Sequence, residues 1–330
     1  MIGAFKQKSP WQQPLIIFLA FATKLIYIVS ATGPVNFFDP GGLLVPFLNH
    51  KAIPKFNSGF LNLLSIGLLL ISALYANSVL ASAKMFNRQF GLVAVSMILV
   101  TGLFPAANLE LPIWILMPLI IYSVSQVMQL YKSDNPTRVI LNIGFATGLL
   151  YILYHPFIFF IPAVFTGLLI MRPFSIRELM MLLLSILTPL YFALAYNYVF
   201  GYWDPLESAP NFDLYILPWI TSYHWYISIA TAGILLLIGF TNLERQLHRT
   251  VISGRKGWQF MLILPIFLIP LIIIPSGNHF AAFATLSFPA AALAANAFIP
   301  QPTNFRQRIM FWMVILVLAL AAFAWRSGSF

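Results

Sequence analysis

The sequence predicts an all-α polytopic transmembrane helical bundle with about eleven spans. Three observations support this fold class. Of the 330 residues, 60% are hydrophobic and only 8% are charged, whereas a soluble domain carries roughly 25% charged residues. The few charges fall in short stretches between apolar runs that are long enough to cross a bilayer. Lysine and arginine sort to one side of these runs. Because no soluble domain fits between the runs, residues 1–330 are expected to form a single integral membrane domain.

Each apolar run is interpreted as one helix, because roughly 30 Å of hydrocarbon needs about 20 residues at about 1.5 Å rise each. In chain order the runs lie near residues 11–31, 58–82, 89–107, 112–131, 138–154, 157–171, 177–200, 218–241, 258–275, 280–298 and 308–326. The first run follows two lysines without a small-residue cleavage site, so a retained helix is expected there. Runs 138–154 and 157–171 are short and flank His155-Pro156. They are either two crossings or a re-entrant pair.

The basic residues predict the orientation of the bundle. Fourteen of the 18 lysines and arginines fall on one side of the runs, three fall on the other side, and Lys24 lies within the first run. Cytoplasmic loops are enriched in these residues, so the amino terminus is predicted inside and the carboxyl terminus outside. This count requires 138–154 and 157–171 to be two crossings. The net charge of +10 then reflects orientation in the membrane, and no nucleic-acid partner is expected because the charges form no patch.

The sequence has no cysteine, which excludes disulfides, thiolate catalysis and cysteine-ligated metal sites. The histidines lack the HxH, HxxxH and HExxH spacings that are typical of metal sites, so no metal site is predicted. Phosphate-loop, dinucleotide and kinase motifs do not occur. The cofactor, if there is one, stays unknown at this stage.

Chemistry-bearing residues gather on the predicted outer side, together with five of the eight acids. Asp39 could act as a catalytic base or hold a divalent metal, or it could simply form an Asp-Pro-Gly turn. Lys24 carries a charge within a span, at a cost of at least about 2.5–3.5 kcal/mol on insertion scales. It could neutralise a lipid phosphate or pair with Asp39. Alternatively, it could snorkel to the interface or bridge two helices.

Further candidates for substrate or lipid-phosphate binding are Asp204, Glu207, His155 and His279. The two acids lie in the long outer loop 201–217 and could bind a divalent cation or sugar hydroxyls, or belong to a solvated loop. The two histidines could act as acid–base groups, or form hydrogen bonds at helix ends.

Residues 138–206 carry a resemblance to known families. This stretch contains Gly148-Leu-Leu-Tyr-Ile-Leu-Tyr-His-Pro156, then Arg172-Pro-Phe-Ser-Ile-Arg-Glu178, and later Tyr196-Asn-Tyr-Val-Phe-Gly-Tyr-Trp203. With its opening segment, the chain resembles an uncharacterised family of polytopic inner-membrane proteins of the Bacteroidota. The resemblance implies a bacterial inner-membrane location and no particular function.

The same stretch is more weakly similar to the middle of C-type, polyprenyl-phosphate-dependent glycosyltransferases. In those enzymes a helical hairpin closes with a proline, a basic cytoplasmic turn follows, and the next helix ends in a Tyr-Asn then Phe-Gly pattern. The similarity implies a catalytic carboxylate in the first outer loop, which corresponds to Asp39 here. It also implies a polyprenyl-phosphate lipid as partner.

Three functions remain open. The first is a non-catalytic subunit of an envelope complex, such as a secretion, translocation or motility assembly, with other envelope proteins and the bilayer as partners. The second is a glycosyltransferase-like enzyme in which Asp39 is the base, Lys24 neutralises phosphate and loop 201–217 binds the acceptor. The third is a transporter. A cavity lined by Asp39 and Lys24 would favour the enzyme, and a filled bundle would favour the subunit.

Overall fold

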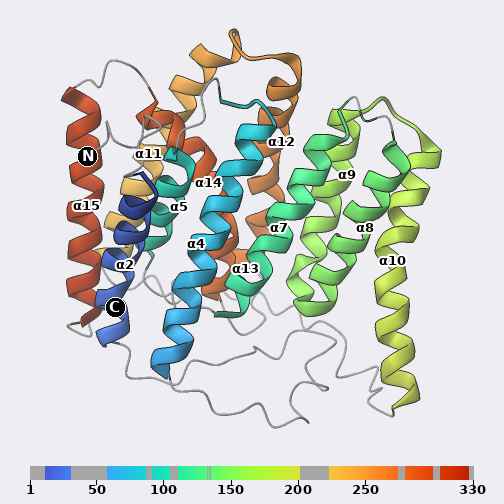
Figure 1. The fold of residues 1–330 in the computed structure, drawn as a ribbon, viewed down its shortest axis with the longest axis horizontal. Coiled ribbons are helices and arrows are strands. Elements are labelled where there is room, and N and C mark those ends of the chain that lie inside the picture. The colour runs from blue at the N-terminus through green and yellow to red at the C-terminus, as the bar shows by residue number, and fades with distance from the viewer. Residues whose placement is uncertain are drawn as a thin grey trace.

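The computed structural model describes residues 12–30, 58–86, 91–104, 111–131, 133, 135–200, 223–273, 279–299 and 305–326. Within these ranges all regular structure is helical and no strand occurs, which confirms the all-α class. Figure 1 shows the helices lying side by side as a bundle. They are α2 Gln12–Ser30, α4 Ser58–Ser82, α5 Leu92–Gly102, α7 Leu111–Gln129, α8 Pro136–Leu153, the 3₁₀ turn η1 His155–Phe159, α9 Phe160–Met171, α10 Ile176–Val199, α11 Tyr223–Leu247, α12 Ile252–Leu268, α13 Pro270–Ile273, α14 His279–Phe298 and α15 Phe305–Arg326.

Four of the described helices are long and apolar enough to cross a membrane. Their spanning segments are Asn62–Ser82, Pro136–Leu153, Ile176–Val199 and Trp225–Leu247. Each overlaps a run that the sequence predicts as a span, although the last extends six residues beyond the predicted run 218–241. The length and composition of these helices therefore indicate a membrane protein.

Two of the other predicted spans differ from the helices found. The predicted run 89–107 contains α5, which has 11 residues and is buried at all of them. At about 1.5 Å per residue such a helix covers roughly half of the hydrocarbon thickness. Because α5 is apolar on every side, it lies in the core of the bundle.

The predicted run 258–275 is also different. Helix α12 begins earlier, at Ile252, and ends at Leu268, after which α13 continues from Pro270 to Ile273. A proline lacks the N–H that would continue the helical hydrogen bonds and crowds the preceding turn. Pro270 therefore explains why one predicted helix is divided into two.

Runs 138–154 and 157–171 form a helical hairpin. Helix α8 ends where Tyr154 adopts an extended backbone, with φ −150° and ψ 106°, and the 3₁₀ turn η1 leads into α9. In Figure 1 α8 and α9 are antiparallel neighbours that run along most of the depth of the bundle.

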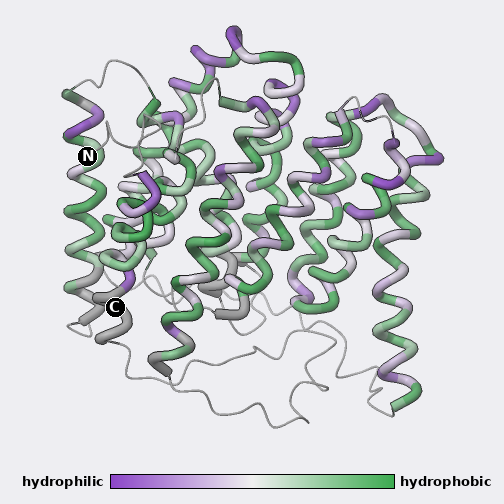
Figure 2. The backbone as a smooth tube through the Cα atoms, in the orientation of Figure 1, coloured by the Kyte–Doolittle hydropathy of each residue, from purple (hydrophilic) through white to green (hydrophobic). Residues whose placement is uncertain are grey.

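One end of the bundle is polar and basic. Helices α4, α7, α9 and α11 end at the upper end in Figure 1, while α8, α10, α12 and α15 begin there. Figure 2 shows most of the hydrophilic positions gathered at the same end. We call this the basic end, after its described residues Lys84, Arg138, Arg172, Arg177, Arg245, Arg249, Arg255, Lys256 and Arg308. Basic residues that are separated along the sequence by apolar runs thus lie together at one end of the folded bundle.

Candidate functional site

The structure describes the side chains of two of the six candidate residues. Asp39, Asp204 and Glu207 lie outside the described residues. His279 is the first residue of α14, and its side chain is also outside them. Lys24 and His155 are described, and they lie in separate contacts.

Lys24 is buried on α2, which packs against α4, α5 and α15, and its side chain reaches Trp114 of α7. Its side chain is only 3% exposed, and Trp114 is fully buried. The Lys24 ammonium lies 4.8 Å from the centre of the Trp114 ring. The negative face of an indole attracts a cation, most strongly where water is excluded. The ring therefore offsets part of the cost of placing this charge among apolar helices.

His155 lies in the aromatic corner that joins α8 to α9. Its ring meets Tyr151 edge-on, with the ring centres 5.4 Å apart. The neighbouring Tyr154 and Phe157 rings also pack edge-on, with centres 5.5 Å apart. His155 is 8% exposed. These contacts show a side chain that packs into a helix corner.

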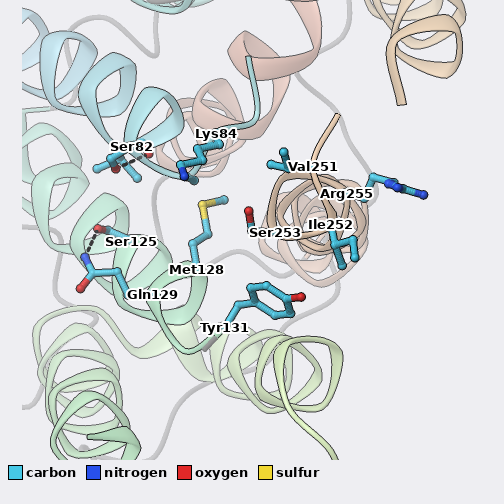
Figure 3. A pocket seen from close by; sticks show the side chains of 12 residues that line it. Ser82, Lys84, Ser125, Met128, Gln129, Tyr131, Val251, Ile252, Ser253 and Arg255 are labelled. Carbon is cyan, nitrogen blue, oxygen red and sulfur yellow. Dashed lines mark hydrogen bonds between the residues drawn. The ribbon is translucent and has the colours of Figure 1, made fainter. Parts of the chain in front are cut away.

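A different group of residues forms a pocket at the basic end. Its volume is about 740 Å³, and it lies where the ends of α4 and α7 meet the start of α12. Figure 3 shows the side chains that surround it. They are Val79, Ser82, Ala83, Lys84, Ser125, Met128, Gln129, Tyr131, Val251, Ile252, Ser253 and Arg255. The described lining thus combines two cations, several hydrogen-bonding groups and apolar side chains.

Lys84 stands at an unusual backbone position in this lining. Helix α4 ends with Met85 N–H donating to the Leu80 carbonyl at 3.3 Å and Lys84 N–H donating to the Ala81 carbonyl at 3.1 Å. This pair of bonds is the Schellman ending of a helix, whose next residue is usually glycine because it must be left-handed. Lys84 takes that place with φ 55°.

The first turns of α12 hold this lysine turn in place. The Trp258 indole N–H donates to the Met85 carbonyl at 3.1 Å, and its ring packs edge-on against Phe86 with centres 5.4 Å apart. A Cβ atom on Gly254 would lie 2.5 Å from the Lys84 carbonyl oxygen. Only glycine fits at this approach, so the backbone of Lys84 is fixed from outside the turn.

Hydrogen bonds and a cation–ring contact also hold the side chains around the rest of the pocket. The Gln129 side-chain amide donates to the Ser125 hydroxyl at 3.1 Å. The Lys256 ammonium lies 5.0 Å from the centre of the Tyr131 ring and donates to the Met171 carbonyl at 3.1 Å. The pocket therefore has walls whose positions are set by bonds between several helices.

Reasoning from the sequence missed this pocket. Lys84 and Arg255 contributed only to the predicted orientation of the bundle. A lysine directly after an apolar helix, where glycine is usual, is a signal that could have drawn attention to one wall. The three segments are far apart in the sequence, so only the fold brings them together.

Comparison with known proteins gives a family and no activity. A family model described as a family of unknown function (DUF6427) matches residues 39–329. No curated protein matches the chain. No solved structure matches it either.

Proposed function

Because the chain belongs to that family of unknown function, we propose from its own residues that it is a non-catalytic subunit of an envelope complex. In this proposal it crosses the bacterial inner membrane about eleven times, with its basic end in the cytoplasm and its carboxyl terminus outside. It works by packing its helices against those of another membrane protein. The arrangement of α10 supports this proposal best.

Helix α10 stands at the edge of the bundle, and its main contact among the described helices is α8 (Figure 1). Only 28% of the 18-residue apolar window within this helix is buried. Its buried stripe is Leu182, Ser185, Ile186, Pro189, Ala193 and Asn197. The rest of α10 is a long, mostly apolar surface that the other described helices leave uncovered.

The uncovered surface of α10 is rich in aromatic side chains, including Tyr191, Phe192, Tyr198 and Phe200, each more than half exposed. The rings of Tyr191 and Phe192 pack edge-on with centres 5.7 Å apart, so the two side chains orient each other on this surface. Aromatic side chains are enriched where proteins bind each other. The occupant we propose is therefore an apolar transmembrane helix of another subunit.

The contact of Lys24 also supports a subunit over an enzyme. The glycosyltransferase-like hypothesis uses the Lys24 ammonium to neutralise a lipid phosphate. In the structure this ammonium packs against the buried Trp114 ring. A cation that stabilises a helix interface is consistent with a packed bundle.

Site-specific photo-crosslinking tests the proposal. A photoreactive residue at Phe192 on α10 should give one discrete protein adduct, since that position would face the partner helix. Met313 on α15 is a matched control, because it is similarly exposed, at 55% against 65% for Phe192. Gentle detergent extraction should also recover the partner in a fixed stoichiometry.

Two results would contradict the subunit proposal. One is a monodisperse lone monomer whose Phe192 position gives only lipid adducts, as the Met313 position does. The other is transfer of a lipid-linked sugar that Asp39→Asn abolishes while the protein stays folded. The second result would establish the enzyme hypothesis instead.

A further inference from the structure

We propose that the pocket at the basic end binds a phosphate group at the surface of the membrane. The twelve lining residues given above define this phosphate pocket. The inference makes no use of α10 or of a partner subunit, because it rests on the ends of α4, α7 and α12. It shares with the proposed function only the cytoplasmic placement of the basic end. Four features of the pocket lead to it.

The first feature is charge. Among the described lining residues Lys84 and Arg255 are cationic and none is acidic. Lys84 is exposed, and no acidic side chain in the described ranges pairs with its ammonium. The Arg255 guanidinium is anchored differently, because its Nε donates to the Thr250 carbonyl at 3.2 Å. In Figure 3 it lies on the rim and points away from the pocket. Lys84 is therefore the residue that would meet an anion directly.

The second feature is a set of hydrogen-bond donors beside Lys84. Ser253 lies in the first turn of α12, a helix of 17 residues. The first N–H groups of a helix have no partner within it and favour negative charge. Figure 3 shows Lys84 and Ser253 lining the same pocket, with the Met128 side chain between them. A phosphate there could accept bonds from the Lys84 ammonium, the Ser253 hydroxyl and the start of α12.

The third feature is the cost of placing a lysine at this position. A left-handed backbone is unfavourable for any residue with a Cβ atom, and Lys84 has φ 55°. Glycine would satisfy the same helix ending without that cost. Contacts from Gly254 and Trp258 impose the conformation. Imposed strain of this kind concentrates at functional sites.

The fourth feature is the apolar part of the lining. Val79, Met128 and Ile252 bring aliphatic surface to the same pocket as Lys84. The pocket also lies at the end of the bundle where the basic residues gather. Basic pockets between membrane helices on the cytoplasmic side fit the head groups of anionic lipids. A soluble phosphate could use the same donors, so the test must separate these two sources.

The test uses the full-length protein in mild detergent. Phosphatidylglycerol, phosphatidylcholine and inorganic phosphate are each titrated, with the melting temperature and native mass spectrometry as readouts. A ligand that binds only the folded state raises the melting temperature as its concentration rises. A rise with phosphatidylglycerol alone identifies the lipid as the source. A rise with inorganic phosphate identifies a soluble phosphate. No rise with either overturns the proposal.

The variants connect any binding to the pocket. Lys84→Gly keeps the backbone conformation and removes the ammonium, so it should fold normally and bind about fivefold more weakly. Lys84→Arg keeps the charge and should retain binding. Arg308→Gln is the control, because Arg308 is an exposed cation of the basic end outside the pocket. If Lys84→Gly binds as the parent does, or Arg308→Gln weakens binding equally, the pocket is not the site.

Discussion

Lys84 occupies a backbone conformation that costs an L-residue about 1 kcal/mol or more. The Schellman ending of α4, whose closing bonds go to the Leu80 and Ala81 carbonyls, requires a left-handed residue at position 84, and the close approach of Gly254 keeps that residue in place. The strain is local and is offset by the hydrogen bond that the Trp258 indole N–H donates to the following Met85 carbonyl. The effect of substituting Lys84 on the free energy of unfolding therefore has a predictable sign.

Lys84→Gly is expected to stabilise the ligand-free protein by about 1 kcal/mol, because glycine adopts the left-handed conformation without a steric penalty. Thermal unfolding in detergent without added lipid measures this change. Lys84→Ala is the control, since it also loses the ammonium but keeps a Cβ atom and should show no comparable gain. A lower melting temperature for Lys84→Gly would show that the ammonium itself holds the turn.

Lys24→Met tests whether the buried ammonium of α2 has a chemical role. Methionine has a similar length without the charge, and the charge carries the insertion cost noted above. We expect the variant to insert and fold at least as well as the parent, and to capture the partner at the α10 surface equally. Partner capture measured by photo-crosslinking at Phe192 checks this expectation. Loss of capture in a folded variant would show that Lys24 does more than pack against Trp114.

At the scale of elements, the packing of α10 against α8 depends on small residues. A Cβ atom on Gly148 would lie 2.5 Å from both the Ile186 carbonyl oxygen and Pro189 Cγ. In the same interface, the Ser185 hydroxyl donates to the Leu141 carbonyl at 2.6 Å. Small residues four apart allow membrane helices to approach closely, and Gly144 and Gly148 have this spacing. This contact is what attaches α10 to the bundle.

Gly148→Ala should therefore destabilise the protein, by about 1–3 kcal/mol, because the added methyl group forces α10 away from α8. Gly67→Ala on α4 is the matched control. A Cβ atom there would meet no described atom within 4 Å, so the higher helix propensity of alanine should add about 0.5–1 kcal/mol. Thermal unfolding of both variants in the same detergent gives the comparison. Equal shifts of the same sign would mean that close α8–α10 packing is not required.

The helix boundaries could be predicted from the sequence where apolar runs are long. They could be predicted less well where packing against neighbouring helices decides where a helix begins and ends. Runs 58–82 and 177–200 became α4 and α10 almost unchanged, since their length alone determines a helix. Helix α5 could not be bounded from the sequence. A uniformly apolar stretch has the same sequence pattern whether the helix faces lipid or lies in a protein core. The burial of α5 on all sides is produced by the neighbouring helices.

At the scale of the whole molecule, the predicted sorting of charge corresponds to one basic end in the fold (Figure 2). The pocket there could not be predicted, because it joins segments near residues 79–84, 125–131 and 251–255. The sequence could identify Lys24 as a buried charge from its place in an apolar run. Its partner Trp114 lies 90 positions away and was beyond reach of any local pattern.

The predicted sidedness is directly testable, because the chain has no cysteine of its own. In Figure 1 α2 and α15 run in the same direction, as an odd number of crossings requires of a first and a last span. A cysteine at Ser329 should react with a membrane-impermeant maleimide in intact spheroplasts. A cysteine at Ser9 should react only after lysis, because positive-inside sorting places it in the cytoplasm. Ser133→Cys, at the basic end, should behave as Ser9→Cys does, and the parent chain should not react. If Ser9→Cys and Ser329→Cys react under the same condition, the number of crossings is even. The basic end would then no longer fix which compartment each loop faces.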